Sequence, residues 1–439
     1  MATKSKFQAI KGTRDLLPPE TALWNHVEQT AREVFATYGF GEIRLPIFEP
    51  TELFARSIGT DTDVVSKEMY TFATGYDSDS VDESVPGRTV TLRPEATASI
   101  CRAYIENNMQ QLPHPVKLYC IGPMFRRERP QKGRYRQFYQ IDAEILGGPD
   151  APAIDAEVVE MLMTFFDKVG LQGTTLYINS VGHSAPNCRR GYVELLRAEL
   201  QKVRDKLGPD SQRRIETNPL RVLDSKVESE QPYIEKLPHI ADHLCEDCAA
   251  NYAAVKRELE LRGVIYEENW RLVRGLDYYT RTTFEITAAG LGSQNAVCGG
   301  GRYDGLIELL GGPPTKATGF AIGEDRLILS LQESANSQSP TIGYQSLSVY
   351  IAWMGDKAYA TAVRAAKDLR NAGFSVELPP VAQKFGKALG QADKLGAKYA
   401  LILGEDEVAE GTWTLKTLAD GTQTKLPEPA LIEHLRKQL

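Results

Sequence analysis

The sequence predicts an α+β protein in which a large domain built on an antiparallel sheet carries a helical insertion and is followed by a small α/β domain. Residues 116–147 read as two long strands joined by a short basic loop, which makes an antiparallel hairpin. Residues 184–268 are charged and helical in pattern, and they interrupt a strand-rich region. Residues 347–439 alternate strand-like and helix-like segments, as a small α/β domain does. The large domain is therefore split into residues 1–183 and 269–330.

The composition is that of an ordinary soluble protein, with 439 residues, 42% hydrophobic and 25% charged, and this length favours two or three domains. A net charge of −7 argues against a protein that coats nucleic acid nonspecifically, although a basic loop can still contact one structured RNA. The start has neither signal-peptide nor transit-peptide character, and no run approaches the roughly 20 apolar residues of a membrane span. We therefore expect a cytoplasmic protein. The six cysteines are too sparse for a disulfide framework, and we expect them to be reduced.

The N-terminal part begins with an arm at residues 7–17, followed by a helix that starts at Pro18-Pro19-Glu20. Apolar residues recur at roughly helical spacing between residues 23 and 35, which predicts one buried helix face. The segment FGEIRLPIFEP that follows is extended and is broken by Pro46. Proline removes a donor from a β-ladder and is favoured at strand edges.

Residues 70–72 and 88–93 are typical of paired strands around an acidic loop at 77–83. The stretch TLRPEAT then places Glu95 and Thr97 just beyond the second strand. One interpretation is a helix start with proline in the first position and glutamate in the first turn, and the local pattern favours it. The other is a carboxylate and a hydroxyl that reach a bound ammonium group.

On the returning strand of the hairpin, the period of two places four side chains on one face: Phe138, Gln140, Asp142 and Glu144. A polar face of an antiparallel sheet is usually solvated. Here Arg126 closes the first strand, and the loop that carries Arg129 and Gln131 is basic. This face can therefore hold both an anion and a small polar ligand.

A helix over residues 155–166 and a strand over residues 174–179 are predicted before the insertion. Within the insertion, Cys245 and Cys248 have the spacing of half a zinc site. No second C-x-x-C or H-x-x-x-H pair completes four ligands, so the sequence favours ordinary thiols on a helix and no metal.

Two motifs follow the insertion. WRLVRGLDYYTRTTFEI predicts a strand over residues 270–286, in which Arg274, Tyr278 and Tyr279 are either half-exposed strand residues or parts of a site. GGGRYDGL, residues 299–306, lacks the Gly-Lys-Ser/Thr ending of a phosphate loop and does not make G-x-G-x-x-G. Its glycines are better explained by a close approach of the backbone.

These stretches resemble the class II aminoacyl-tRNA synthetases, and FRRERPQKGRYRQFYQ is close to motif 2 of the histidyl enzymes. TLRPEAT is similar to their TLRPEGT, with Ala96 in place of glycine, and RGLDYY matches their histidine-specific motif completely. ATGFAIGEDRLILS resembles motif 3, although Glu324-Asp325 departs from the usual hydrophobic residue and glutamate before the arginine. The N-terminal helix and strand resemble motif 1, which builds the homodimer interface of the family. The region beyond a polar linker at 331–346 resembles its anticodon-binding domain.

The resemblance implies a class II synthetase fold and a role for each matching residue. Arg126 would bind the α-phosphate of ATP, Arg274 would assist activation beside it, and Arg326 would hold the γ-phosphate. Contacts with the histidine substrate would come from two pairs of residues: Glu95 with Thr97, and Tyr278 with Tyr279. The loop residues Arg129 and Gln131 would reach the acceptor end of the tRNA. ATP would be a substrate, and Mg²⁺ would arrive with it.

These residue types suit the chemistry of amino-acid activation, which brings a carboxylate to the α-phosphorus of ATP and therefore needs fixed cations. Arg126 and Arg274 supply them, because the rigid fork of arginine matches phosphate oxygens in two places. Histidine needs a carboxylate near its ammonium group and acceptors around its imidazole, which Glu95, Gln140, Glu144 and the tyrosines provide.

The expected function is therefore that of a homodimeric histidine–tRNA ligase, which joins L-histidine to the histidine tRNA through histidyl-adenylate. The alternative is the histidine-binding regulatory paralogue that activates ATP phosphoribosyltransferase. That paralogue typically loses the arginine of RGLDYY and the C-terminal domain, whereas this chain has Arg274 and residues 347–439. A nonenzymatic sensor of uncharged tRNA would need a fused effector domain, and none is expected.

Overall fold

A computed structural model describes residues 7–59, 62, 64–73, 89–274, 276, 278–289, 295–335 and 347–438. The chain divides into two compact units, one of Met1–Asp15 with Trp24–Pro340 and one of Leu16–Leu23 with Thr341–Leu439. Within the described part of the chain, no helix is both long and apolar enough to cross a membrane. The predicted acidic loop at 77–83 lies outside the described residues.

The large unit is built on an eight-stranded sheet. Its six central strands are antiparallel, and only the short edge strands pair in parallel. The strands, in their order across the sheet, are β1 (Gly41–Glu42), β5 (Val116–Phe125), β6 (Gln137–Leu146), β11 (Ala317–Gly323), β10 (Ala296–Arg302), β9 (Thr282–Thr287), β7 (Thr175–Ser180) and β8 (Glu267–Glu268). The predicted hairpin is confirmed, because β5 pairs with β6 from Val116↔Leu146 to Phe125↔Gln137.

Helices cover both faces of this sheet. On one face lie α1 (Glu20–Thr37) and α4 (Pro152–Lys168), where the Phe35 ring of α1 contacts Phe165 of α4 and Phe320 of β11. On the other lies α3 (Thr97–Glu106), which packs against buried residues of β5 such as Cys120. The strand alternation predicted for residues 138–145 therefore separates a face under α1 and α4 from a face that α3 covers only in part.

A smaller three-stranded sheet and several short elements complete the unit around α3. The sheet has the order β2 (Phe48–Pro50), β4 (Thr89–Leu92), β3 (Tyr70–Ala73), which confirms the predicted pairing of the strands around the acidic loop. Beside it lie α2 (Thr51–Ile58), the π-helix η1 (Val64–Glu68), the 3-10 helix η2 (Met109–Gln111) and α9 (Leu306–Leu309). The helix α10 (Glu324–Ala335) follows β11 and packs against β6, β10 and β11 of the large sheet.

Two expectations need correction. Of the described residues in the strand predicted over 270–286, only 282–286 form a strand, as part of β9 (Thr282–Thr287). The described residues before it pack against the insertion or line the cavity described below. Residues 331–335 continue α10 and are not linker, since Leu331 is buried on that helix. Residues 336–346 of the predicted linker lie outside the described residues.

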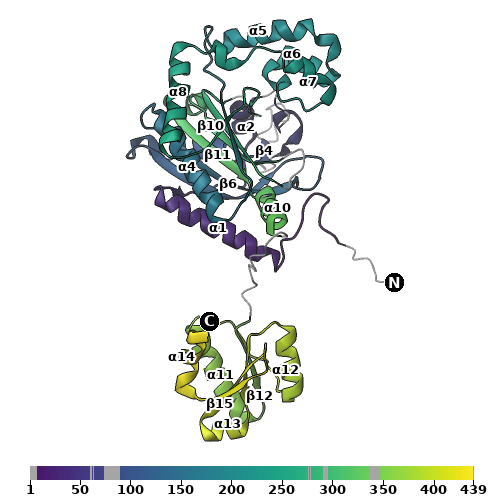
Figure 1. Ribbon diagram of the computed structural model, residues 1–439, viewed down its shortest axis with the longest axis vertical. Helices are drawn as coiled ribbons and strands as arrows, with labels where there is room; N and C mark the ends of the chain where they lie inside the picture. The colour runs from purple at the N-terminus through teal and green to yellow at the C-terminus, as the bar shows by residue number, and fades with distance from the viewer. Residues whose placement is uncertain are drawn as a thin grey trace, which may run out of the picture. The chain divides into compact units, whose positions relative to one another are not determined.

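The stretch between β7 and β8 is helical. Figure 1 shows α5, α6 and α7 grouped beyond one end of the sheet, from which α8 returns to lie along α4. The elements are α5 (Arg189–Lys202), η3 (Arg204–Lys206), α6 (Pro209–Thr217), η4 (Pro219–Val222), η5 (Glu228–Glu230), α7 (Gln231–Ile234), η6 (Ile240–His243) and α8 (Glu246–Leu261). Their core, formed by residues such as Tyr192, Leu196 and Ile215, also includes Tyr279 from beyond the insertion.

The small unit is an α/β domain, as predicted. Its five-stranded sheet has the order β13 (Val376–Glu377), β12 (Val349–Trp353), β14 (Tyr399–Leu403), β15 (Thr412–Thr417), β16 (Gln423–Pro427). The first three strands are parallel, and β15 and β16 add an antiparallel hairpin. The helices are α11 (Asp356–Asn371), α12 (Phe385–Lys394), α13 (Glu405–Glu410), η7 (Glu428–Ala430) and α14 (Leu431–Gln438).

Candidate active site

A cavity of about 440 Å³ lies on the sheet face that α3 covers only in part. Strands β6, β9, β10 and β11, the start of α3 and the irregular residues before β9 all contribute side chains to it. Every residue predicted to bind histidine or ATP lines this one cavity: Glu95, Thr97, Arg126, Gln140, Glu144, Arg274, Tyr278, Tyr279 and Arg326. The fold thus brings together residues that are more than 200 positions apart in the sequence.

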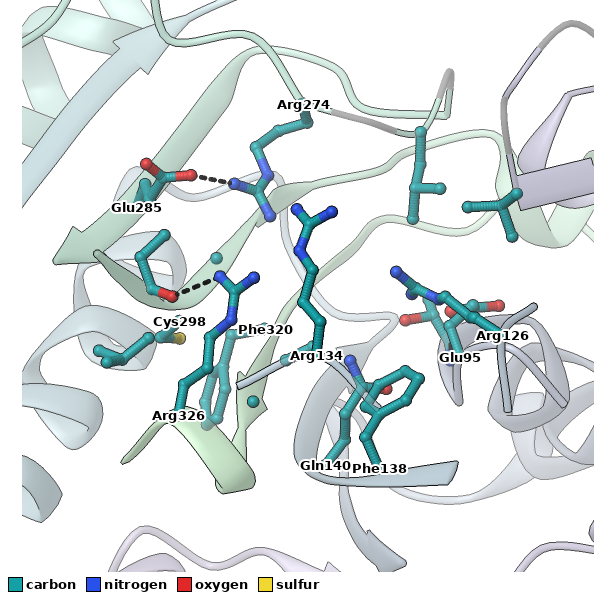
Figure 2. A pocket seen from close by; sticks show the side chains of 18 of the residues that line it. Glu95, Arg126, Arg134, Phe138, Gln140, Arg274, Glu285, Cys298, Phe320 and Arg326 are labelled. Carbon is teal, nitrogen blue, oxygen red and sulfur yellow. Dashed lines mark hydrogen bonds and ion pairs between the residues drawn. The ribbon is translucent and has the colours of Figure 1, made fainter. Parts of the chain in front are cut away.

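The cavity is lined by five arginines: Arg126, Arg134, Arg221, Arg274 and Arg326, of which Figure 2 labels all but Arg221. Arg126 donates from Nε to the Pro94 carbonyl at 3.0 Å, and its guanidinium lies over the Phe138 ring at 5.3 Å. Arg326 donates to the carbonyls of Gly133, at 3.3 Å, and Ala296, at 3.0 Å. Burial and the neighbouring charge of Arg134 lower the pKa of Arg326. Such a concentration of cations favours the binding of a polyanion.

Arg274 is held in place from three sides. Its Nη1 donates to Glu285 Oε2 at 2.9 Å, and its guanidinium lies 5.8 Å from the centre of the Tyr279 ring. The guanidinium also lies against Gly299 of β10, where an added Cβ would be only 2.0 Å from Arg274 Nη2. The glycine motif therefore does allow close approach, at Gly299 by a guanidinium and at Gly300 by the Gly319 carbonyl of the next strand.

The polar end of the cavity is organised around Glu144. Its carboxylate accepts hydrogen bonds from Thr97 Oγ1 at 2.7 Å and from the Tyr303 hydroxyl at 2.6 Å. Burial raises the pKa of Glu144 to about 8. The opposite position on β11 is Gly319, where an added Cβ would lie 1.6 Å from Glu144 Oε2. A glycine is therefore needed there to leave room for the carboxylate.

Glu95 combines the two interpretations drawn from the sequence. Its carboxylate accepts the backbone N–H groups of Thr97, at 2.8 Å, and Ala98, at 2.9 Å, which satisfies donors at the start of α3. A helix does start here, but at Thr97, so Pro94 and Glu95 precede the helix and do not lie in its first turn as predicted. The side chain also lines the cavity, and a carboxylate that accepts two hydrogen bonds keeps lone pairs for a ligand. Burial raises the pKa of Glu95.

Gln140 and the tyrosines complete the pocket. Among the described residues, Gln140 Oε1 has no hydrogen-bond partner, although the atom is buried. The rings of Tyr278 and Tyr279 lie 4.9 Å apart, and Tyr278 meets Tyr303 edge-on at 5.6 Å. Aromatic rings line one part of this pocket, and an unpaired hydrogen-bond acceptor lies in it. Such a pocket suits a small planar ligand that carries N–H donors. Gly275 and Asp277 of the RGLDYY motif lie outside the described residues.

The two loop residues predicted to meet RNA lie apart from the cavity. Arg129 and Gln131 are exposed in the loop between β5 and β6, and neither lines the cavity. The backbones of Gln131 and Arg134 exchange hydrogen bonds of 3.1 and 2.9 Å, which fold the loop into a tight turn. This placement is compatible with a partner that approaches from solvent.

Sequence reasoning missed several cavity residues, among them Arg134, Glu285 and Tyr303. Arg134 lies in the basic loop and pairs with Glu128 at 3.1 Å. A signal for Glu285 was present, since it is the one charged residue of the strand TTFEIT. Tyr303 follows the glycines of β10, and nothing in the sequence pattern distinguishes it from a core tyrosine.

Comparisons with known proteins cover nearly the whole chain. A family model described as Histidyl-tRNA synthetase matches residues 12–327, and one described as Anticodon binding domain matches residues 348–438. The histidine–tRNA ligase of Koribacter versatilis is 52% identical over 434 residues, which cover 98% of this chain and 96% of that protein. The one from Solibacter usitatus is 51% identical over 430 residues, 98% of this chain and 99% of that protein. A crystal structure of the apo S. aureus histidyl-tRNA synthetase, 36% identical, superposes with a TM-score of 0.78 and covers 98% of this chain and 100% of that one.

The large unit thus has the class II aminoacyl-tRNA synthetase fold, with an anticodon-binding domain after it. Within that class, the chain belongs to the histidyl-tRNA synthetase family.

Proposed function

We propose that this chain is a histidine–tRNA ligase, which uses ATP to activate L-histidine and transfers it to the 3′ end of the histidine tRNA. The observation that carries this function is that one cavity holds five arginines together with a polar and aromatic pocket. The arginines are complementary to a triphosphate and the pocket to histidine. Charging of a histidine tRNA transcript by the purified chain tests the proposal, and charging with a different amino acid and tRNA would contradict it.

In this proposal each of three arginines interacts with a different part of the reacting ATP. Arg126 binds the α-phosphate, Arg326 holds the γ-phosphate, and Arg274 neutralises charge that develops between the histidine carboxylate and the α-phosphorus. Mg²⁺ enters with ATP. The cavity also contains the carboxylates of Glu128 and Glu285, which are oxygen ligands of the kind that Mg²⁺ prefers.

Histidine lies at the other end of the cavity. Glu95 and Thr97 face its ammonium group, Gln140 and Glu144 supply acceptors for the remaining N–H groups, and Tyr278 and Tyr279 line the imidazole. A site that pairs with both ring nitrogens rejects apolar side chains by up to about 10⁴ to 10⁵, so no editing domain is needed.

The remaining parts serve the tRNA and the assembly. Arg129 and Gln131 contact the acceptor end, and residues 347–439 form the domain that binds the anticodon. The catalytic domain comprises residues 1–183 and 269–330, separated by the insertion 184–268, and the linker begins after α10. The enzyme is cytoplasmic and acts as a homodimer through its motif 1 region.

The regulatory paralogue is less well supported, because full-length relatives at 51–52% identity are named ligases and Arg274 lies in the cavity.

Replacing Gln140 by Ala should raise the KM for histidine without abolishing catalysis. The loss leaves a polar group of the substrate unpaired in a buried site, at a cost of about 1 to 3 kcal/mol. Steady-state exchange kinetics with ATP saturating measure the effect, and Gln29→Ala on the exposed side of α1 is the matched control. An unchanged KM would remove Gln140 from the pocket.

Histidine binding should release protons near pH 7. The pKa of Glu144 is raised to about 8 in the free site, so below pH 8 the carboxyl is mostly protonated. A bound N–H donor or ammonium stabilises the ionised form, which lowers this pKa, expels a proton and makes affinity rise as the pH increases toward 8. Calorimetry in buffers of different ionisation enthalpy counts the protons. Glu144→Gln should lose this release, and equal release in both proteins would exclude Glu144 as its source.

Arg129→Ala should slow charging of tRNA more than it slows the exchange of pyrophosphate. Arg129 is exposed in the loop and does not line the cavity, so its loss removes a phosphate contact with RNA and leaves the adenylate site intact. The two rates are compared for the variant and for Lys202→Ala, which removes an exposed cation of α5. Equal slowing of both reactions would place the loop on ATP.

A further inference from the structure

A second group of chemically reactive side chains lies outside the active-site cavity, where the insertion joins the sheet. It consists of His183, Cys188, Cys245 and Cys248, whose ligand atoms all lie within 4.8 Å of one another. His183 Nδ1 is 3.1 Å from Cys248 Sγ and 3.7 Å from Cys245 Sγ. The fold thereby adds two ligands to the C-x-x-C pair that the sequence left incomplete.

Two chain segments meet to form this group. The first runs from the end of β7 to the start of α5, where Cys188 directly precedes the helix. The second is the start of α8, with Cys245 just before the helix and Cys248 in its first turn. Gly182 turns the first segment with φ +61°, and a Cβ there would lie 2.7 Å from Cys188 Sγ. The absence of a side chain at Gly182 therefore leaves room for the sulfur.

The separations fit a tetrahedral metal centre. With Zn–S near 2.3 Å and Zn–N near 2.0–2.1 Å, tetrahedral geometry places ligand atoms about 3.6 to 3.8 Å from one another. The two His183–sulfur distances, 3.1 and 3.7 Å, lie on either side of the lower limit of that range, and all ligand atoms of the group lie within 4.8 Å of one another. The three cysteines are free thiols. Four ligand atoms therefore converge on one point, which a pairwise disulfide arrangement does not require.

We propose that His183, Cys188, Cys245 and Cys248 bind one structural Zn²⁺ ion. Three thiolates and one imidazole form a soft donor set that selects zinc, and four protein ligands leave no open position for catalysis. The ion with its ligands would carry one net negative charge. The Arg281 guanidinium, which pairs with Asp150 at 2.9 Å, also lies beside Cys248 and would offset part of that charge.

The site ties the insertion to the histidine pocket. Arg189, the residue after Cys188, donates to the backbone carbonyl of Tyr279, and Tyr279 lines the active-site cavity. The ion fixes the starts of α5 and α8 against the end of β7 and thereby holds this contact. Removal of the ion should consequently raise the KM for histidine as well as lower thermal stability.

The metal content of the full-length protein, purified without chelators, tests the proposal. We expect about one zinc per chain by elemental mass spectrometry, and a near-complete loss in Cys245→Ser. The matched control is Cys120→Ala, which removes a buried thiol of β5 far from the group and should retain the zinc. A chelator should lower the Tm of the wild type and of the control but not that of Cys245→Ser.

Cobalt titration keeps the test independent of any variant. Reduced wild-type protein stripped of metal should bind one Co²⁺ and develop the intense visible bands of a tetrahedral site together with a thiolate charge-transfer band. Wild-type protein that lacks stoichiometric zinc and gives no such bands would overturn the proposal. Peptide mapping of the freshly purified protein gives a second way to overturn it. A disulfide between Cys245 and Cys248, or between Cys188 and either of them, would identify a redox pair instead of a metal site.

Discussion

Replacing Arg274 by Ala should abolish most histidine activation while leaving histidine binding nearly intact. Arg274 is fixed by Glu285, Tyr279 and Gly299 before any ligand arrives, so its charge is preorganised where the carboxylate and α-phosphate meet. Removing one such donor costs about 10² to 10³ in rate, and a charged donor in a site that excludes water costs more. Because the charge develops in the transition state, the loss should fall on the rate of adenylate formation and not on binding.

Single-turnover adenylate formation, measured beside calorimetric histidine binding, separates the two effects. Arg274→Lys should recover only part of the rate, since an ammonium keeps the charge but loses the planar fork. Weakened histidine binding with near-normal turnover at saturating histidine would make Arg274 a substrate anchor and contradict the assigned role.

Replacing Gly299 by Ala should produce a loss of similar order without removing any functional group. The new Cβ would lie 2.0 Å from Nη2 and 2.4 Å from Cζ of Arg274, so the guanidinium must leave its position. The obstructing atoms are the end of a flexible side chain, and the fold should therefore tolerate the change. We expect adenylate formation to fall by about 10², because a preorganised charge that is displaced no longer meets the developing one.

A double-mutant cycle gives this prediction its control. If both changes act through one guanidinium, Gly299→Ala should add little to the loss already caused by Arg274→Ala. Gly41→Ala, in β1 of the same sheet, places its Cβ where no atom lies within 4 Å and should leave the rate unchanged. Fully additive losses at Gly299 and Arg274 would show that the glycine has another role.

Sequence patterns correctly predicted those features of the structure that depend on residues close together in the chain. The alternation along residues 138–145 correctly separated Gln140 and Glu144 from the side chains under α1 and α4, because strand periodicity alone decides which face a residue occupies. The hairpin was predicted for the same reason. Helix and strand patterns also predicted the small unit from β12 to β14, but not its last elements, such as the hairpin of β15 and β16. The resemblance then added which polar residues belong together, and the cavity does unite them.

Features that depend on tertiary packing were not accessible in this way. Nothing in the sequence says that Cys188 lies beside Cys248, 60 residues later, since that contact arises only when α5 and α8 both return to the end of β7. The residues before β9 read as strand because they are apolar and aromatic, yet they pack into the core of the insertion and the cavity. Glu95 showed that a helix start and a ligand contact need not be alternatives.

The exchange of pyrophosphate with ATP, assayed in turn with each of the twenty amino acids, tests the central claim most directly. It requires no tRNA, so it reports only whether the cavity activates an amino acid and which one. The structure predicts exchange that depends on histidine, because the acceptors Gln140 and Glu144 select a side chain with N–H donors and the arginines bind the triphosphate. Exchange with another amino acid alone, or no exchange while histidine still binds, would contradict the account.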